Sequence, residues 1–560
     1  MKVKEVIDKF LNIKINFLVL GVILIGIFSF CLAPVTFQND TYYTIKIGEY
    51  IFNNGIDMMD HFSWHENLAY TYPHWLYDLL TYIIYSFSGF KGIYICTCIL
   101  SSILGISIFL VNSKLTKQKG ISFIVTIGAL YFLQDYIAAR AQLFTFIIFI
   151  WEIYFIENFL ESKKIKYALA LIVSSLIIAN VHVATWPFFF ILFMPYIGEY
   201  IVANLADFII YNRMKFLFYN LKMKINKKDS SKVEKIKAKI SELEKKTQKV
   251  KEKREELKLN PYKIIIKNNS NVKYLIIIMI VCILMGFLTP IKDTPYTYLY
   301  KTMQGNTTKN ISEHLPMTLA NDEAVMVMLV VFLAILMFTK TKIRLNDLFM
   351  ISGLCFLMLM TKRQLSMFVL ISSVVLVRLL IELVFNYTDY TKDDIDFVEK
   401  NILGGIALIV LIMFLCVDSL KPKLENKFVD ESSYPVEACD YILDNINLEN
   451  TRFFNEYNFG SYMLYRNIPV FIDSRADLYT PEFSGFEDKD IFTDFIKTSS
   501  LSQFYEDTFE KYSITHVLCT KKSKINSIIT KTKDENYKEL YSDDNFVIYE
   551  RVCEKSDINN

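Results

Sequence analysis

Long apolar stretches alternate with short polar connections along most of this chain. A helix that crosses the hydrocarbon core of a bilayer needs about 20 mostly apolar residues. The stretches that approach this length cover residues 15–34, 91–112, 120–134, 142–160, 165–181, 185–209, 273–290, 323–340, 346–362, 364–385 and 402–419. The pattern predicts a polytopic α-helical membrane protein with about 11 transmembrane helices.

Composition agrees with this prediction and excludes several protein classes. Of the 560 residues, 53% are hydrophobic and only 21% are charged. The formal net charge of +2 is too small for a chain that binds nucleic acid over its whole length. Nine cysteines, most of them in apolar runs, form neither a disulfide framework nor a CxxC zinc pattern.

Basic residues predict the orientation of the spans. Lysines precede the first apolar stretch, which places the N-terminus in the cytoplasm under the positive-inside rule. Residues 73–89 are also apolar, but a crossing there would move the basic loops 113–119 and 162–166 outside. We therefore predict that 73–89, which is rich in Tyr and Trp, is a helix lying at the membrane interface. The expected location is a bacterial cytoplasmic membrane, with the C-terminal domain outside.

Four segments follow from this topology. Residues 1–210 form an N-terminal membrane module that contains a first outer loop at 35–90. Residues 211–272 form a basic cytoplasmic insert, residues 273–419 a second membrane module, and residues 420–560 a small extracytoplasmic α/β domain. In the last segment, RFFNEYNFGSYMLYRNIPVFIDSRADLY predicts strand, helix and strand, YSITHVLCT a further strand, and YKELYSDDNFVIYERV a hairpin.

The insert has a charge that differs from the rest of the chain. Residues 211–272 hold 19 Lys and Arg against 7 Asp and Glu, and apolar residues recur there at helical spacing. This predicts an amphipathic helix or a short coiled coil. A cytoplasmic partner or anionic lipid would fit such a surface. A solvated linker helix that only satisfies the positive-inside rule is the alternative.

The first outer loop carries the carboxylate best placed for chemistry. Asp40 follows the first apolar stretch by a few residues, at the expected membrane surface. A carboxylate there can take a proton from an acceptor hydroxyl, orient that hydroxyl or hold a metal. It can also cap a helix that begins at Thr41, because Asp is a favoured N-cap residue.

The loop resembles the opening of the GT-C superfamily, integral-membrane glycosyltransferases that use polyprenyl-phosphate-linked sugars. The resemblance is to the bacterial branch related to family 39 and to the rhizobial lipopolysaccharide-core transferases. The matching motifs are Asp40-Thr-Tyr42, Gly55-Ile-Asp57, Asp60-His-Phe62-Ser63 and His74-Trp75-Leu76. Two positions depart from the family pattern: Asp57 replaces a proline, and Asn39-Asp40 replaces an acidic pair.

The resemblance implies a GT-C-like fold, with Asp40 as catalytic base and Asp60 as a second catalytic candidate that positions donor or acceptor. It covers the membrane part in topology and is motif-specific only over about residues 35–80. Tails of some relatives carry N-x-Y-x-x-G-x-Y-L and F-I-D-x-R, and Asn455, Gly460, Asp473 and Arg475 occupy those positions. For Asp473 and Arg475 we favour a buried structural ion pair over contact with sugar.

Outer corners between spans carry further candidates. Arg140 joins two spans, and Lys362-Arg363 joins two others. A guanidinium at the membrane surface suits a phosphate, because its planar fork binds two oxygens. We predict that Arg140, Lys362 and Arg363 bind the donor phosphate together with His182, although cations at span ends often only snorkel to the surface.

Other outer groups are candidates for substrate contact. They are His61, His74, Glu313 and His314. Zinc at His61, His65 and His74 is conceivable, but no HExxH motif is present. We predict no cofactor and no metal site, and a divalent metal remains the open alternative.

The function that fits best is transfer of a sugar from a polyprenyl-phosphate donor to an acceptor on the outer face, with Asp40 as general base. The expected partners are the donor, a glycan or lipid acceptor and membrane lipid, and no nucleic acid. Two alternatives stay open: a transporter or flippase for a lipid-linked glycan, and a non-catalytic membrane scaffold.

Overall fold

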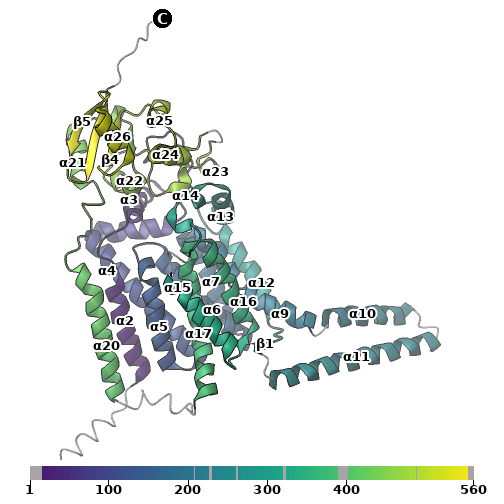
Figure 1. Ribbon diagram of the computed structural model, residues 1–560. Coiled ribbons are helices and arrows are strands. Elements are labelled where there is room, and N and C mark those ends of the chain that lie inside the picture. The colour runs from purple at the N-terminus through teal and green to yellow at the C-terminus, as the bar shows by residue number, and fades with distance from the viewer. Residues whose placement is uncertain are drawn as a thin grey trace, which may run out of the picture.

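The computed structural model describes residues 16–206, 209–225, 230–259, 263–318, 323–388, 402–486 and 489–552. The lysines that set the expected orientation of the first span, residues 2–14, lie outside these ranges. The bundle consists of α2 (Phe17–Leu32), α4 (Trp75–Thr116), α5 (Lys119–Leu133), α6 (Gln142–Ser162), α7 (Ile165–Val181), α8 (Trp186–Ile191), α9 (Met194–Ala206), α12 (Val272–Leu284), α15 (Glu323–Phe338), α16 (Leu345–Met360), α17 (Leu365–Tyr387) and α20 (Ile402–Leu420) (Figure 1).

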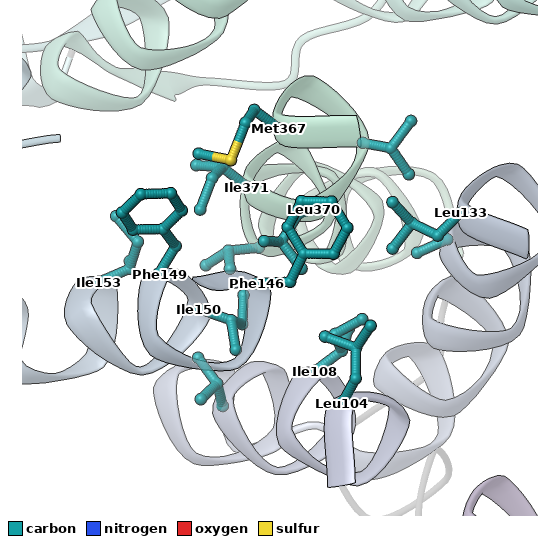
Figure 2. Packing of buried hydrophobic residues seen from close by; sticks show 14 of the residues in the cluster. Leu104, Ile108, Leu133, Phe146, Phe149, Ile150, Ile153, Met367, Leu370 and Ile371 are labelled. Atoms are coloured by element: carbon teal, nitrogen blue, oxygen red, sulfur yellow. The ribbon is translucent and has the colours of Figure 1, made fainter. Parts of the chain in front are cut away.

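Each predicted span holds apolar helix, although 185–209 is divided between α8 and α9, and the predicted fold class is confirmed. By length and composition, five helical segments among the described residues can cross a membrane, and shorter apolar helices accompany them. Apolar side chains from α4, α5, α6 and α17 interlock in the middle of the bundle (Figure 2). The labelled residues of this core are Leu104, Ile108, Leu133, Phe146, Phe149, Ile150, Ile153, Met367, Leu370 and Ile371.

Large apolar side chains also cover the outside of the bundle. On α15, Val330 is 65% exposed and Phe338 is 84% exposed. Exposed apolar surface of this extent is unusual for a soluble protein, whereas a lipid environment favours it. The chain is therefore a membrane protein.

The segment predicted to lie at the interface is a separate helical piece. The helix α4 is interrupted at Gly89, which has φ 59° and ψ −154°. A residue with a side chain rarely adopts this conformation, so glycine allows the chain to change direction there. Figure 1 shows the early part of α4 lying across the upper ends of the upright helices. The helix predicted for residues 73–89 is present, and its place at the membrane interface stays a prediction.

Four charged side chains from α6, α17 and the start of α16 form ion pairs with one another. Arg344 contacts Glu157 and Asp347 at 2.7 Å each, and Arg378 contacts the same carboxylates at 2.7 and 2.9 Å. The hydroxyl of Tyr196 donates a further hydrogen bond to Glu157. We call Glu157, Arg344, Asp347 and Arg378 the inner cluster. It joins α6, α16 and α17, and each charge has two opposite partners.

The basic insert forms a helical hairpin that projects from the bundle (Figure 1). Its arms are α10 (Ile209–Ile225) and α11 (Ser230–Leu259). The predicted helix in this segment is present. After the hairpin, β1 (Ile264–Ile265) pairs in parallel with β2 (Ile343–Arg344).

The C-terminal segment folds into an α/β domain at the upper end of the bundle in Figure 1, the end predicted to face outward. Its sheet has the order β3-β4-β6-β5, in which β3 is parallel to β4 and the other pairs are antiparallel. The strands are β3 (Phe453–Asn455), β4 (His516–Thr520), β5 (Tyr537–Ser542) and β6 (Phe546–Arg551), and the helices of the domain are α21 (Val436–Asn445), α22 (Tyr457–Tyr465), α23 (Pro481–Ser484), α24 (Ile491–Ser500), α25 (Tyr505–Lys511) and α26 (Lys524–Thr532).

One predicted strand is wrong. The segment around Phe471 was expected to be a strand, but it forms only an isolated bridge between Val470 and Ser63 of the first outer loop. Asn455 explains its shape, since its amide accepts from Phe471 N at 2.8 Å and donates to Ile472 O at 2.7 Å. A Cβ on Gly460 would lie 2.0 Å from Ile472 O, so only glycine fits against this segment.

Candidate active site

Asp40 lies in the first turn of α3 (Asn39–Asn54) and is not its cap. The helix begins at Asn39, so Gln38 occupies the N-cap position, and the expected start at Thr41 is wrong by two residues. The Asp40 carboxylate instead contacts the Arg140 guanidinium at 2.6 Å. The hydroxyl of Thr41 bonds to Ala139 O at 3.5 Å, which ties α3 to the corner that carries Arg140.

Arg140 connects two acidic segments that are far apart in the sequence. Besides Asp40, it faces Glu313 at 3.6 Å. Burial lowers the pKa of Arg140, but the charges of Asp40 and Glu313 outweigh burial and raise it, so the side chain stays charged. The longer contact to Glu313, whose side chain is 51% exposed, is a weak one.

The second basic corner lies beside the first. Glu313 and His314 belong to η4 (Ser312–His314), and Lys362 and Arg363 belong to η5 (Lys362–Gln364). Lys362 N donates to Leu315 O at 2.9 Å, and Arg363 faces His314 Nε2 at 3.4 Å. The Tyr136 hydroxyl, from the Arg140 corner, donates to Lys362 O at 3.2 Å. These contacts bring both corners and η4 together.

The two corners enclose a cavity of about 730 Å³. Three basic side chains, Arg140, Lys362 and Arg363, line it together with three acidic ones, Asp135, Glu313 and Glu323. Its other lining residues are Gln38, Tyr131, Phe132, Gln134, Tyr136, Ala138, Gln142, Val325 and Leu365. Charged groups and apolar span ends therefore meet in one space, which suits a ligand with a polar head and an apolar tail.

Some buried polar atoms beside the cavity have no hydrogen-bond partner among the described residues. They are Gln38 Oε1, Asn39 Oδ1 and Arg140 Nε. Most buried polar atoms in proteins are paired, so unpaired ones require an explanation. Two of the three residues, Gln38 and Arg140, also line the cavity, so part of the hydrogen-bonding capacity beside it is unused.

Two histidines lie beside this site as a neutral pair. The rings of His74 and His182 are 4.9 Å apart, and His182 Nδ1 is 2.9 Å from Thr145 Oγ1. Burial, together with the charges of Arg363 and Arg140 and against that of Asp40, lowers the pKa of His74 to about 4. Burial, and then the neighbouring His74, place the pKa of His182 well below its usual value. Both rings are therefore uncharged at neutral pH.

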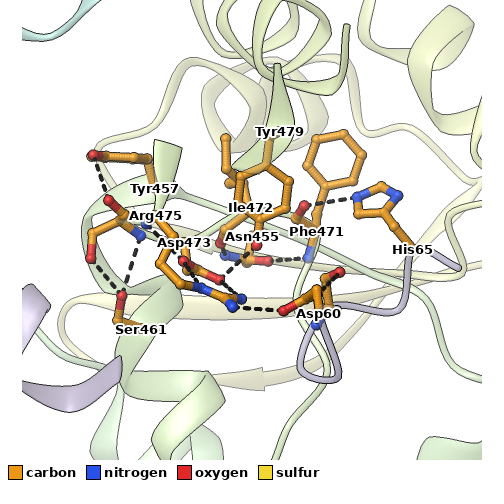
Figure 3. Close-up of polar contacts among 12 residues, drawn as sticks. Asp60, His65, Asn455, Tyr457, Ser461, Phe471, Ile472, Asp473, Arg475 and Tyr479 are labelled. Atoms are coloured by element: carbon orange, nitrogen blue, oxygen red, sulfur yellow. Dashed lines mark hydrogen bonds and ion pairs between the residues drawn. The ribbon is translucent and has the colours of Figure 1, made fainter. Parts of the chain in front are cut away.

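Asp60 belongs to a different cluster (Figure 3). It contacts Arg475 at 2.6 Å, and Arg475 contacts Asp473 at 2.7 Å, with these side chains almost fully buried. Burial raises the pKa of Asp60, but Arg475 and Ser63 outweigh burial and lower it. The cluster fastens the first outer loop to the C-terminal domain. This placement agrees with the structural ion pair favoured for Asp473 and Arg475.

The same part of the domain also holds the segment between α12 and α15. Asp477 accepts hydrogen bonds from Tyr298 at 2.7 Å and from Thr307 at 3.0 Å. Those residues lie in α13 (Thr294–Gln304) and α14 (Thr307–Asn310), just before Glu313. The C-terminal domain thus fixes both loops that carry acidic residues to the site.

The remaining histidines of the first loop are separated from one another. His61 pairs with Asp57 at 2.6 Å, and His65 Nε2 contacts Phe471 O at 2.9 Å. Across the described residues, no three or more His, Cys, Asp or Glu side chains are grouped closely enough to hold a metal ion. The histidines considered for zinc are thus not brought together.

The structure brings some of the predicted site residues together and leaves others apart. Asp40, Arg140, Lys362, Arg363, Glu313 and His314 come together, with His74 and His182 beside them, whereas Asp60 and His61 lie elsewhere. Gln38 and Glu323 also line the cavity, and the sequence analysis did not predict them. The signal available was weak, namely polar residues at the outer ends of apolar stretches.

Comparisons with known proteins add likenesses to solved structures, two of which are described here. No family model matches the sequence, and a sequence search finds no curated protein that matches it. An oligosaccharyltransferase of Archaeoglobus fulgidus in the apo form is 11% identical with a TM-score of 0.49, over 90% of this chain and 69% of that one. ArnT from Cupriavidus metallidurans bound to undecaprenyl phosphate is 6% identical with a TM-score of 0.47, over 95% of this chain and 97% of that one. At such identities and scores, neither likeness identifies what this chain binds or transfers.

Proposed function

We propose that the protein is a membrane glycosyltransferase of the GT-C type, which moves a sugar from a polyprenyl-phosphate donor to an acceptor hydroxyl. The observation that carries this proposal is Arg140, which lines the charged cavity and also holds Asp40 at 2.6 Å. Arg140 is thus both a candidate phosphate-binding group and the ion-pair partner of the candidate base. The loop motifs around Asp40 and Asp60 support the same class of enzyme.

The donor phosphate would occupy the cavity between the two basic corners. Arg140 and Arg363 would bind its oxygens with their forked guanidinium groups, and Lys362 would add a positive charge. The polyprenyl tail would leave the cavity past apolar residues such as Phe132 and Leu365. In this arrangement His182, which is neutral, supports the site through Thr145 rather than by charge.

Donor binding would also free the base. In the present structure the Asp40 carboxylate is occupied by Arg140. A phosphate competes for the same guanidinium, so its binding would weaken this ion pair and release Asp40 for proton transfer. Glu313, at 3.6 Å from Arg140, would remain a second acidic neighbour of that side chain.

The chemical step would be an inverting displacement. The acceptor oxygen attacks the anomeric carbon, the bond between that carbon and the phosphate oxygen breaks, and polyprenyl phosphate leaves with the electron pair. The acceptor proton passes to the Asp40 carboxylate. Arg140, Lys362 and Arg363 would stabilise the charge of the leaving phosphate, and positioning would supply much of the remaining rate.

The test is sugar transfer by the purified protein from a panel of polyprenyl-phosphate sugars. We expect turnover with one donor and release of free polyprenyl phosphate. Nucleotide sugars serve as the control donors and should give none. Binding of polyprenyl-phosphate sugars without any transfer, or transfer from a nucleotide sugar, would contradict the proposal.

A further inference from the structure

The helical hairpin of the basic insert has an apolar face that no described part of the chain covers. In α10, the side chains of residues 215–225 are described. Leu217, Phe218, Leu221 and Ile225 are 57%, 59%, 59% and 81% exposed, respectively. At about 100° per residue, these four positions fall within about 100° of one another around the helix. They form a continuous stripe, which we call the α10 stripe.

A different face of α10 packs on α11. Tyr219 and Met223 are half-buried, and both lie away from the α10 stripe on the helix. On α11, Ile236 is only 7% exposed, and Val233 and Ile240 on the same face are half-buried. The hairpin therefore already has its own apolar contact. The α10 stripe is a second apolar surface, which this contact does not explain.

Lysines border the α10 stripe on both sides. Lys224 follows one edge, and Lys215 and Lys222 follow the other. Residues 209–225 contain no Asp or Glu, and residues 211–272 hold 19 basic against 7 acidic residues. The surface that meets this stripe must therefore offer apolar groups in the middle and negative charge around them.

The hairpin is placed where such a surface is available. Figure 1 shows it running sideways from the lower part of the bundle, at the end opposite the C-terminal domain, with α10 lying above α11. The hairpin thus runs across the direction of the upright helices, as a helix lying along a bilayer surface would. The helix α9, which belongs to the bundle, directly precedes α10 in the chain.

We infer that α10 is an interfacial helix that binds the anionic lipid surface next to the bundle. The α10 stripe would enter the boundary between headgroups and acyl chains, and the flanking lysines would reach lipid phosphates. Lys and Arg stems suit this position, because they cover apolar surface while their charge stays at the headgroups. The inference depends on the membrane location of the chain and not on its proposed chemistry.

The test places an environment-sensitive fluorophore on each arm of the hairpin in the full-length protein. One variant carries Leu221→Cys in the α10 stripe, and the matched control carries Lys239→Cys on the exposed side of α11. Both are reconstituted in nanodiscs of phosphatidylcholine with phosphatidylglycerol. Protein without an introduced cysteine, labelled in the same way, gives the background from the nine native cysteines.

We expect lipids with a nitroxide at a shallow acyl position to quench the label at 221 at least about threefold more than the label at 239, because interfacial helices insert only about 5–10 Å. Aqueous iodide should show the opposite order. Replacing phosphatidylglycerol by phosphatidylcholine, or adding Lys222→Glu and Lys224→Glu, should reduce the lipid quenching at 221.

Two results would overturn the inference. Equal iodide quenching at 221 and 239 would place the α10 stripe in water. A label at 221 that is shielded from iodide but not quenched by nitroxide lipids would show that protein covers the stripe, either a second copy or another partner.

Discussion

The two ends of α6 and α17 carry clusters of charge that differ in kind. At the outer ends lie Arg140, just before α6, and Arg363, just before α17. Glu157 and Arg378 lie on the same two helices, roughly 22–26 Å further along for a rise of 1.5 Å per residue. The same pair of helices thus joins the candidate active site to the inner cluster.

The inner cluster is closed. Each carboxylate of Glu157 and Asp347 meets both Arg344 and Arg378 at 2.7–2.9 Å. We call Asp40, Arg140, Glu313 and Arg363 the outer cluster. It is open, since Glu313 is 3.6 Å from Arg140 and Arg140 Nε has no partner among the described residues. It also borders a cavity of about 730 Å³, in contrast to the compact packing of the inner cluster.

This difference separates support from binding. Charges removed from water are costly, and a network in which every charge is paired keeps that cost low. In the inner cluster the charged groups pair with one another, and these pairs join helices. The outer cluster keeps part of that capacity unused, as a site for a charged ligand must.

Asp40→Asn should show the largest effect on activity. Asparagine keeps the shape but cannot take the proton, so the transfer rate should fall about 10²–10⁴-fold, the usual contribution of general base catalysis. Steady-state transfer assays measure the fall. Glu66→Gln, a change at an exposed carboxylate in the same loop, is the control and should leave the rate unchanged. Equal losses in both variants would show a disturbed loop and not a lost base.

Glu157→Gln should act on stability instead. It leaves Arg344 and Arg378 with one carboxylate between them, and removal of one partner from a buried ion network costs about 3–5 kcal/mol. Thermal or denaturant unfolding of the protein in detergent measures this loss. Glu161→Gln, at an exposed position on the same helix, should have little effect. A Glu157→Gln protein as stable as the wild type would remove the structural role of the inner cluster.

Arg363→Lys should weaken donor binding more than catalysis. Lysine keeps the charge but loses the forked geometry, so we expect the KM for the donor to rise about tenfold while kcat changes little. Lys522→Met removes an exposed cation of the C-terminal domain and serves as the control. A fall in kcat with an unchanged KM would assign Arg363 to the chemical step and not to the donor phosphate.

Of the four changes, mild acid should have the smallest effect, a modest loss of folding stability. Burial lowers the pKa values of His65 and His74 to about 4, below their usual 6.5. The folded state therefore binds these protons less readily than the unfolded state. Their contribution to stability is complete above about pH 6.5 and is lost as the pH falls towards 4. Melting temperatures between pH 7.5 and 4.5 should fall less steeply in His65→Gln than in the wild type, and identical slopes would contradict this origin.

Local pattern in the sequence was sufficient for the helices and for several site residues. Apolar length predicted the spans, and guanidinium groups at corners between spans indicated Arg140 and Arg363 as phosphate-binding candidates. The structure brings both arginines to one cavity. The hairpin β5–β6 was likewise predicted from alternation over a short stretch.

Pairings between distant segments were not predictable in this way. Arg475 reaches Asp60 across more than four hundred residues, and this contact depends on how the C-terminal domain docks on the first loop. The cap assigned to Asp40 failed for the same reason, because the local rule does not include the partner that Arg140 supplies. The closed arrangement of the inner cluster also arises only from the packing of three helices.

The most direct test of the open outer cluster measures two properties of Asp40→Asn together, its affinity for undecaprenyl phosphate and its rate of sugar transfer. If Arg140 is shared between Asp40 and the donor phosphate, loss of the carboxylate should leave the affinity equal or higher while the transfer rate falls about 10²–10⁴-fold. A variant that loses affinity and transfer together, or one that still transfers sugar at the wild-type rate, would contradict the shared role of Arg140.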